Sequence, residues 1–180
     1  VLDWPVRDAT DQREQTMYWL LDQHGLPNMY RRYVIMYVNG ARRGEIYDDI
    51  QQPSGSTVEQ WFSDGPDGTL MKPDCWDEFN DNGDRETGCL DLNSLEIFTT
   101  TGGVKKMPRY RWVWKPRAIR GTANDYTEIF NLVDAANAPT NGFQSAMESQ
   151  ADMEHWMRTF AANDLASYWD AFGNPNAKNT

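Results

Sequence analysis

One short run of residues predicts a β-hairpin early in this chain. Residues 33–38 read Tyr-Val-Ile-Met-Tyr-Val, an apolar sequence rich in β-formers, and Asn39-Gly40 follows directly. Asn-Gly favours the tight two-residue turn whose twist matches that of two antiparallel strands. We therefore predict a hairpin whose return strand covers roughly Arg42 to Ile50.

Helical patterns lie on both sides of this hairpin. Apolar residues recur at helical spacing from about Asp11 to His24, and Gly25 predicts where that helix ends. The sequence Ser56-x-x-Glu59 is typical of a capping box and predicts a short helix. Amphipathic periodicity predicts three more helices in the second half of the chain, over residues 124–136, 143–149 and 152–164.

The middle of the chain is expected to hold strands and a loop. Residues 69–72 and 95–100 are predicted as strands, and so are residues 109–114, where Tyr, Trp and Trp alternate with Arg and Val. Residues 73–92 are polar and are predicted as a long loop. The fold class that follows is α+β, with a mixed part followed by a helical part.

Charge is distributed unevenly along the sequence. The formal net charge is −10, which argues against a general nucleic-acid binder because the chain would repel phosphate. Residues 74–91 carry seven acids and one base, whereas residues 105–120 carry seven bases and no acid. One interpretation is two solvated surfaces that face each other, and another is a basic surface that receives an anionic ligand or an acidic substrate. No apolar run approaches the ~18 residues of a membrane helix.

The two cysteines, Cys75 and Cys89, lie at the ends of a polar, glycine-containing segment. Neither belongs to a Cys-x-x-Cys pair, which disfavours a zinc-finger type of site. A disulfide between them is compatible with the sequence if the parent protein is exported, and free thiols are compatible with it otherwise. The chain begins with Val1 and has no signal peptide, so we expect it to be a fragment of a longer protein.

The end of the chain carries a set of residues that suits phosphoryl transfer. A predicted helix runs out into a segment that holds Asp170, then Gly173, then Lys178-Asn179. An aspartate accepts the proton of the attacking hydroxyl, an asparagine holds a metal ion, and a lysine neutralises charge on the transferred phosphate. The alternative is a polar loop built from turn-forming residues.

Taken in order, these segments resemble the CotH-type kinase family, which is named for a bacterial spore-coat protein. Residues 8–14 hold the pattern D-x-T-x-x-R-E, residues 32–47 resemble the family's strand, NG turn and G-x-x-Y strand, and residues 162–179 resemble its W-D-x-x-G…K-N catalytic-loop pattern. The resemblance covers nearly the whole chain. It implies a divergent protein-kinase-like fold, present in part, with residues 1–72 from the nucleotide lobe and hinge, 73–120 a polar loop and strands, and 121–180 the helical lobe up to the catalytic loop.

The resemblance also implies roles for individual residues. Asp170 is the expected catalytic acid and Asn179 the expected metal-binding amide, with ATP and Mg²⁺ or Mn²⁺ as cofactors. The residues expected to contact or position the nucleotide are Glu14, Arg13, Gln51 and Lys178. Glu14 is expected to pair with a lysine upstream of Val1. An acid common after the G-x-x-Y strand appears here as Gln51, unless Asp48 or Asp49 takes its place.

Function follows from the same resemblance. We expect an atypical kinase that transfers the γ-phosphate of ATP to Ser or Thr of a protein substrate, with this fragment inactive alone. The expected location is the outside or surface of a bacterium, with neither nucleic acid nor membrane as a partner. The alternatives are a pseudokinase scaffold and a non-catalytic module that binds a glycan or protein through exposed aromatics, with four tryptophans as candidates: Trp61, Trp76, Trp112 and Trp114.

Overall fold

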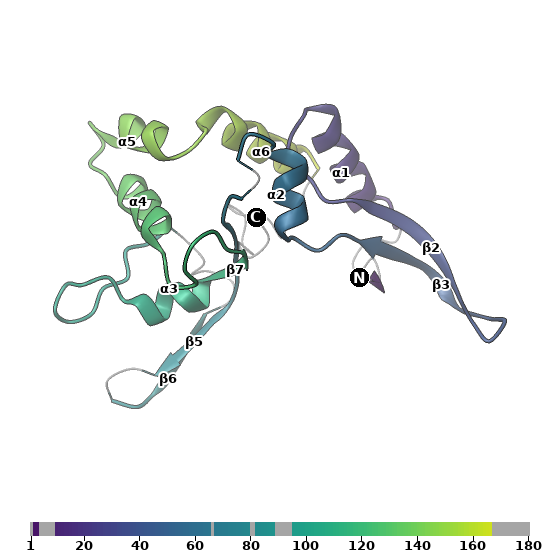
Figure 1. The fold of residues 1–180 in the computed structure, drawn as a ribbon, viewed down its shortest axis with the longest axis horizontal. Helices are drawn as coiled ribbons and strands as arrows, with labels where there is room; N and C mark the ends of the chain where they lie inside the picture. The colour runs from purple at the N-terminus through teal and green to yellow at the C-terminus, as the bar shows by residue number, and fades with distance from the viewer. Residues whose placement is uncertain (1, 4–9, 66, 80–81, 89–94, 167–180) are drawn as a thin grey trace.

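The computed structural model describes residues 2–3, 10–65, 67–79, 82–88 and 95–166 (Figure 1). The described part is mixed α+β, as the sequence predicts. Its strands are β1 (Leu2–Asp3), β2 (Arg31–Val38), β3 (Ala41–Ile50), β4 (Leu70–Pro73), β5 (Trp76–Phe79), β6 (Arg85–Gly88) and β7 (Trp114–Ala118). Its helices are α1 (Arg13–Gln23), α2 (Gly55–Trp61), α3 (Met107–Val113), α4 (Thr127–Ala136), α5 (Phe143–Gln150) and α6 (Met153–Leu165).

The predicted hairpin is confirmed as β2 and β3, which form a three-stranded antiparallel sheet with β1 in the order β1-β3-β2. Asn39 and Gly40 both have positive φ, at 52° and 79°, as a two-residue hairpin turn of this kind requires. The pairing shifts between Val34 and Met36, where β3 carries extra residues. Gly44 allows this bulge because its φ is +62° and an added Cβ would lie 2.5 Å from the Tyr47 hydroxyl oxygen.

Helix α1, near the beginning of the chain, packs against helix α6, the last helix of the described residues. Met17 and Leu21 of α1 pack with Leu26 and with Ala162 of α6 in one buried cluster. The apolar spacing predicted this buried side of α1. Gly25, with φ +63°, ends the helix, and its N–H donates to the Asp22 carbonyl. Contact with α6 brings the segment that leads toward residue 167 close to the first helix.

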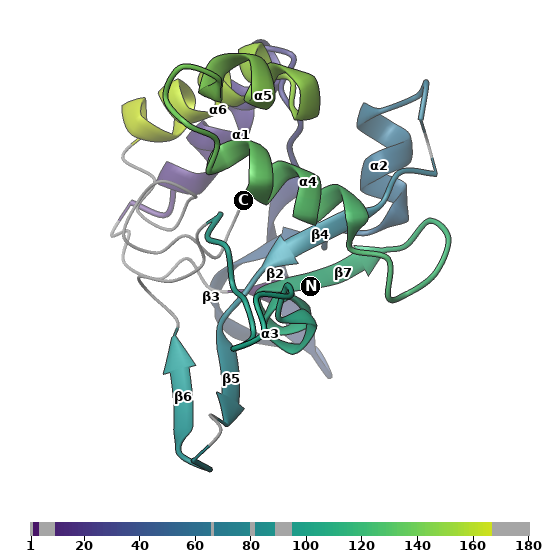
Figure 2. The same cartoon turned by 90° about the vertical axis from the view of Figure 1, so that its left-hand side faces the viewer.

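A second core lies in the other half of the molecule and is built by α3, β7 and α4. Its buried members are Tyr110, Val113, Trp114, Tyr126 and Val133. Figure 2 shows α4 and the β4–β7 pair on this side, with the β5–β6 hairpin projecting away from the body. Predicted helices over 124–136, 143–149 and 152–164 are confirmed as α4, α5 and α6, and the predicted strand over 69–72 is confirmed as β4.

The predicted strand over residues 109–114 is wrong, because residues 107–113 form helix α3. Tyr110, Val113 and Trp114 are buried at spacing i, i+3 and i+4, while Trp112 points outward and is 43% exposed. The alternation of aromatic residues suggested a strand, but the core selects the helical spacing. Pro108, in the first turn of α3, is tolerated there because its missing N–H would have no helical partner.

Two other predictions for the middle of the chain fail. Residues 95–100 form no strand, and only an isolated bridge joins Thr99 to Lys105. The predicted loop over 73–92 contains the antiparallel hairpin of β5 and β6. The Arg85 guanidinium donates to the Asp77 carboxylate across that hairpin, with Nε lying 3.0 Å from Oδ2.

The short helix α2 begins one residue before the predicted capping serine. Ser54 is its N-cap, and the Ser54 N–H donates to Thr57 Oγ1 at 3.3 Å. Thr57 therefore takes the place predicted for Glu59, and Ser56 lies inside the helix. In the part of the chain that the structure describes, no helix is both long enough and apolar enough to span a membrane.

Candidate functional site

A buried group of charged and polar side chains lies where α1 packs on the sheet. Its centre is Arg31 at the start of β2, whose Nε donates to Asp48 Oδ2 at 3.1 Å. Glu14 of α1 forms an ion pair with Nη1 of the same arginine. Gln15 Nε2 donates to Asp48 Oδ1 at 3.2 Å, and the Arg31 guanidinium lies over the Tyr18 ring, 5.4 Å from its centroid. We call these five residues the Arg31 cluster.

Periodicity explains how these side chains meet. Residues 14, 15 and 18 lie on one side of α1, while Met17 and Leu21 face the apolar cluster shared with α6. On the sheet, Tyr33 pairs with Asp48 and Arg31 pairs with Ile50, so these four side chains share one face. The helix therefore presents a carboxylate and an amide to a sheet face that carries one cation and one anion.

Burial makes this cluster costly to disturb. The Arg31 and Asp48 side chains are 6% and 1% exposed, whereas the neighbouring pair Arg32–Asp49 is 61% and 31% exposed. A buried ion pair gains little net stability over an apolar pair, but removing one partner leaves a buried charge uncompensated. The Arg31 guanidinium contacts both carboxylates of the cluster, and Gln15 holds the second oxygen of Asp48.

The residues predicted to contact the nucleotide do not all lie in the Arg31 cluster. Glu14 lies in the Arg31 cluster, and Asp48, considered from sequence as a substitute for Gln51, is its most buried member. Arg13 precedes Glu14 at the start of α1 with an exposed side chain. The sequence interpretation overlooked Arg31, although a two-residue turn at Asn39-Gly40 already puts residues 31 and 48 on the same sheet face.

Gln51 directly follows β3, and its side chain makes hydrogen bonds to two other segments of the chain. Its Oε1 accepts from the Tyr30 N–H at 2.8 Å, and its backbone N–H donates to the Tyr30 carbonyl at 2.9 Å. Gln51 Nε2 also donates to Thr57 Oγ1 at 3.4 Å. The side chain thereby links the start of β2 to helix α2, in the segment that sequence analysis compared with a hinge.

The three remaining candidates, Asp170, Lys178 and Asn179, lie outside the described residues. Helix α6 ends at Leu165, shortly before them, and Ala162 packs this helix against α1. Asp152 caps the start of α6, since its Oδ1 accepts from the His155 N–H at 3.0 Å. That hydrogen bond lowers the pKa of Asp152 below its ordinary value.

The acidic and basic segments meet in the second half of the molecule, as one interpretation of the sequence expected. Lys115 Nζ lies 3.0 Å from Asp74 Oδ2, and Arg109 lies 3.6 Å from Glu86. Partial burial raises the pKa of Asp74, but hydrogen bonds from Lys115 and from the Cys75 N–H outweigh it, so the pKa lies below its ordinary value. Cys75 itself is disulfide-bonded, and the sequence contains one other cysteine, Cys89, which lies outside the described residues.

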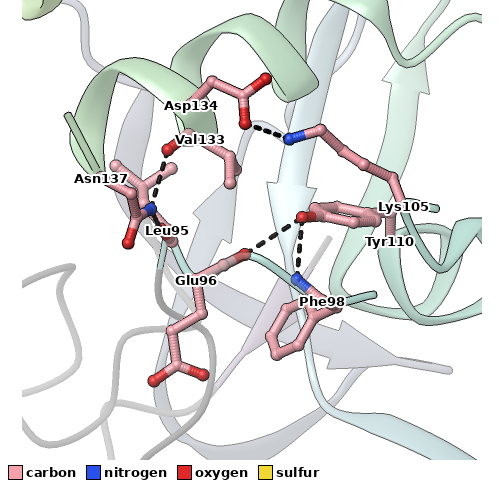
Figure 3. Close-up of polar contacts among 8 residues, drawn as sticks. All are labelled: Leu95, Glu96, Phe98, Lys105, Tyr110, Val133, Asp134 and Asn137. Carbon is pink, nitrogen blue, oxygen red and sulfur yellow. Dashed lines mark hydrogen bonds and ion pairs between the residues drawn. The ribbon is translucent and has the colours of Figure 1, made fainter. Parts of the chain in front are cut away.

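Figure 3 shows how the irregular segment after residue 94 is held between α3 and α4. The buried Tyr110 hydroxyl accepts from the Phe98 N–H and donates to the Glu96 carbonyl, both at 3.1 Å. Asn137 Nδ2 donates to the Leu95 carbonyl at 2.6 Å, and Lys105 forms an ion pair with Asp134. These contacts satisfy backbone groups that a strand would have paired, so they serve as a scaffold.

The tryptophans named for a glycan-binding surface differ in their exposure, and the side chain of one of them, Trp76, lies outside what the structure describes. Trp114 is 8% exposed and belongs to the second core. Trp61 is half-buried, and its indole N–H donates to the Asn28 carbonyl at 2.7 Å. Trp112 is exposed beside Lys115, whose Nζ lies 5.4 Å from the ring centroid. The expectation that Trp114 is available for stacking on a sugar is therefore wrong.

The described parts of the chain contain no group of three or more His, Cys, Asp or Glu side chains that could hold a metal ion. The expected metal-binding residue, Asn179, falls outside them. Its amide oxygen is a donor type that Mg²⁺ and Mn²⁺ accept.

Comparison with known protein families gives a match over almost the full length. The family described as CotH kinase protein matches residues 1–179. This match confirms the resemblance found from the ordered sequence segments. Searches of the curated proteins and of the solved structures gave no significant match.

Proposed function

This chain belongs to the CotH kinase family, and on that premise we propose that it forms part of a protein kinase that transfers the γ-phosphate of ATP to serine or threonine hydroxyls. The observation that carries the proposal is the extent of the family match. It includes both the helix that holds Glu14 and the segment that holds Asp170 and Asn179.

The arrangement of the first half supports a kinase-like fold for this domain. Helix α1 packs on an antiparallel sheet through charged and polar groups. After Gln51 the chain forms α2, the strands β4–β6, α3 and β7, and only then the helices α4–α6. A nucleotide lobe in kinases combines such a sheet with one packed helix that carries a functional glutamate. Glu14 is that glutamate in our proposal, and Arg31 holds it against the sheet.

The proposed chemistry assigns a role to each residue near the end of the chain. The Asp170 carboxylate accepts the proton of the substrate hydroxyl, whose oxygen forms the new bond to the γ-phosphorus as the bond to ADP breaks. Lys178 neutralises negative charge on the transferred group. Asn179 would help to hold Mg²⁺ or Mn²⁺, which would supply charge neutralisation at the phosphates when bound.

We also propose that the parent protein is exported and acts outside the cell or on its surface. The disulfide at Cys75 supports this location, because stable disulfides form in oxidising compartments and are rare in the cytosol.

The experiment uses the intact parent protein that contains this chain. It is incubated with γ-labelled ATP, a divalent metal and candidate protein substrates, beside two variants. Asp170→Asn removes the proposed catalytic carboxylate, whereas Asp164→Asn makes the same change at an exposed position near the end of α6. The proposal predicts label transfer by the parent and by Asp164→Asn and loss of at least about a hundredfold in Asp170→Asn.

Equal label in all three proteins would remove Asp170 from the proposed chemistry. Absence of label from all three folded proteins would support the pseudokinase alternative.

A further inference from the structure

The start of α1 is fixed to the sheet at two successive points. Asp11, two residues before the helix, has a φ of 55°, and its carbonyl oxygen accepts from the Tyr33 hydroxyl. Glu14, in the first turn of the helix, pairs with Arg31. A residue other than glycine keeps a positive φ only where its surroundings determine it, although aspartate tolerates it better than most. The sheet therefore determines where α1 begins.

A chain of hydrogen bonds leads from α1 to the sheet and back to α1. Gln15 Nε2 donates to Asp48 Oδ1 and Arg31 Nε donates to Asp48 Oδ2, so each oxygen of this buried carboxylate accepts a hydrogen bond. The same guanidinium contacts Glu14 through Nη1. Because a guanidinium is planar and its N–H groups have fixed directions, anchoring Nε on Asp48 also sets the direction of Nη1. Glu14 is thus held by a side chain that is itself held.

Stability alone does not account for this buried charge network. A buried ion pair often gives no more stability than well-packed apolar side chains of similar volume. The apolar side of α1 is already packed on α6 through Met17 and Leu21. What the Arg31 cluster adds is a defined direction for the Glu14 carboxylate, and functional groups are oriented by supporting hydrogen bonds of this kind.

We propose that Arg31 is a positioning residue for phosphoryl transfer: anchored by Asp48, it holds the Glu14 carboxylate in the orientation that pairs with the phosphate-contacting lysine of a kinase. This inference rests on the proposed function. In kinases the helix glutamate and that lysine must both be in place for transfer. One carboxylate can accept from both cations, because its two oxygens offer about four acceptor sites. Arg31 acts through Glu14 and is assigned no contact with the nucleotide.

A paired apolar replacement separates loss of catalysis from loss of folding. Arg31→Met/Asp48→Leu removes both buried charges, so it should regain much of the stability that Arg31→Met loses. Label transfer from γ-labelled ATP is measured for the intact parent protein, for this double variant and for Arg32→Met, which changes the neighbouring exposed arginine. We expect kcat of the double variant to fall at least about tenfold with KM for the protein substrate unchanged, and Arg32→Met to keep the parental kcat.

A second measurement on the same proteins needs no nucleotide. Hydrogen exchange followed by mass spectrometry compares the first turn of α1, around Glu14, with its last turn, around Leu21. In the double variant we expect the first turn to exchange at least about tenfold faster, because its anchor on the sheet is gone. The last turn, which packs on α6, should exchange as it does in the parent protein.

The outcomes distinguish this inference from the proposed function. A double variant that transfers label at the parental rate, or whose first turn of α1 exchanges as in the parent protein, would overturn the role of Arg31 while leaving the proposed function in place. An equal loss of kcat in Arg32→Met would overturn it as well. A folded parent protein that transfers no label would overturn the proposed function and this inference with it.

Discussion

Arg31 Nε lies 3.1 Å from Asp48 Oδ2, and the two side chains are almost completely shielded from water. Their neighbours Arg32 and Asp49 form a similar pair at 3.0 Å between the same two strands, but on the exposed side. The two pairs have the same residue types, but they differ in burial and in the additional contacts that Glu14 and Gln15 make with the buried pair. They provide an internal comparison of what burial does to an ion pair.

Replacing the buried arginine should be far more destabilising than replacing the exposed one. Arg31→Met removes the buried cation that contacts the Asp48 and Glu14 carboxylates, and we expect a loss of about 3–5 kcal/mol in the free energy of unfolding. Arg32→Met should cost about 0–1 kcal/mol. Urea unfolding followed by circular dichroism measures both values. A double variant, Arg31→Met with Asp48→Leu, should recover much of the loss, and equal effects of the two single variants would contradict the account.

The Tyr110 hydroxyl should contribute measurably to the free energy of unfolding, because it makes two buried hydrogen bonds to the backbone. Tyr110→Phe leaves the Phe98 N–H and the Glu96 carbonyl without their partner in a buried place, and we expect a loss of about 1–3 kcal/mol. The same change at the exposed Tyr37 is the control and should be close to neutral. A neutral Tyr110→Phe in chemical unfolding would show that water replaces both contacts.

Acid should weaken the ion pair of Asp74 and Lys115 as the pH falls through the folded-state pKa of Asp74, which lies below 3.8. The folded-state pKa of Asp74 lies below its ordinary value of 3.8, so the unfolded chain binds more protons as pH falls. The contribution of Asp74 to stability is therefore complete above the unfolded pKa and disappears as pH drops through the folded pKa. Free energies of unfolding measured between pH 2 and 6 should differ between the protein and Asp74→Asn at the upper end and converge at the lower end.

A variant of Lys115, the ion-pair partner of Asp74, tests whether this lysine lowers the pKa of Asp74. Lys115→Gln removes the cation while leaving the carboxylate, so the pH dependence of its stability should become shallower between pH 2 and 6. A Lys115→Gln protein with the same pH dependence as the original would mean that Lys115 does not set the pKa of Asp74.

The disulfide at Cys75 should be present without added oxidant and should stabilise the fold. Alkylation of the unreduced protein should leave both cysteines unmodified, and reduction should make both reactive, as mass spectrometry can show. Reduction should lower the free energy of unfolding by about 2–4 kcal/mol. Alkylation of the untreated protein at two positions would contradict both the bond and the exported location that we propose from it.

The sequence was most informative where local signals agree with the tertiary structure. Asn39-Gly40 predicted the hairpin, and the spacing of Met17 and Leu21 predicted the buried side of α1, because turn chemistry and periodicity are local properties. The segment at Tyr110–Trp114 was misassigned, since alternating aromatics suit a strand and only the surrounding core selects the helix.

In the candidate site, too, the local pattern could be predicted from the sequence and the tertiary contacts could not. Glu14 and Asp48 were recognised as candidates from their places in a pattern, but their common partner Arg31 depends on how α1 packs on the sheet. The hairpin of β5 and β6 was missed because residues 73–92 are mostly polar and carry no alternating apolar pattern over the two strands. Asp170, Lys178 and Asn179 remain predictions from sequence.

The central claim is that the parent protein transfers the γ-phosphate of ATP, and the most direct measurement compares ATP labelled at the γ-phosphate with ATP labelled at the α-phosphate. The intact protein, a candidate substrate and Mg²⁺ or Mn²⁺ are incubated with each, and the modified residues are identified by mass spectrometry. The account predicts γ-label alone, recovered on serine or threonine and lost in Asp170→Asn. Label from the α-position, or no label from either nucleotide with a folded protein, would contradict it.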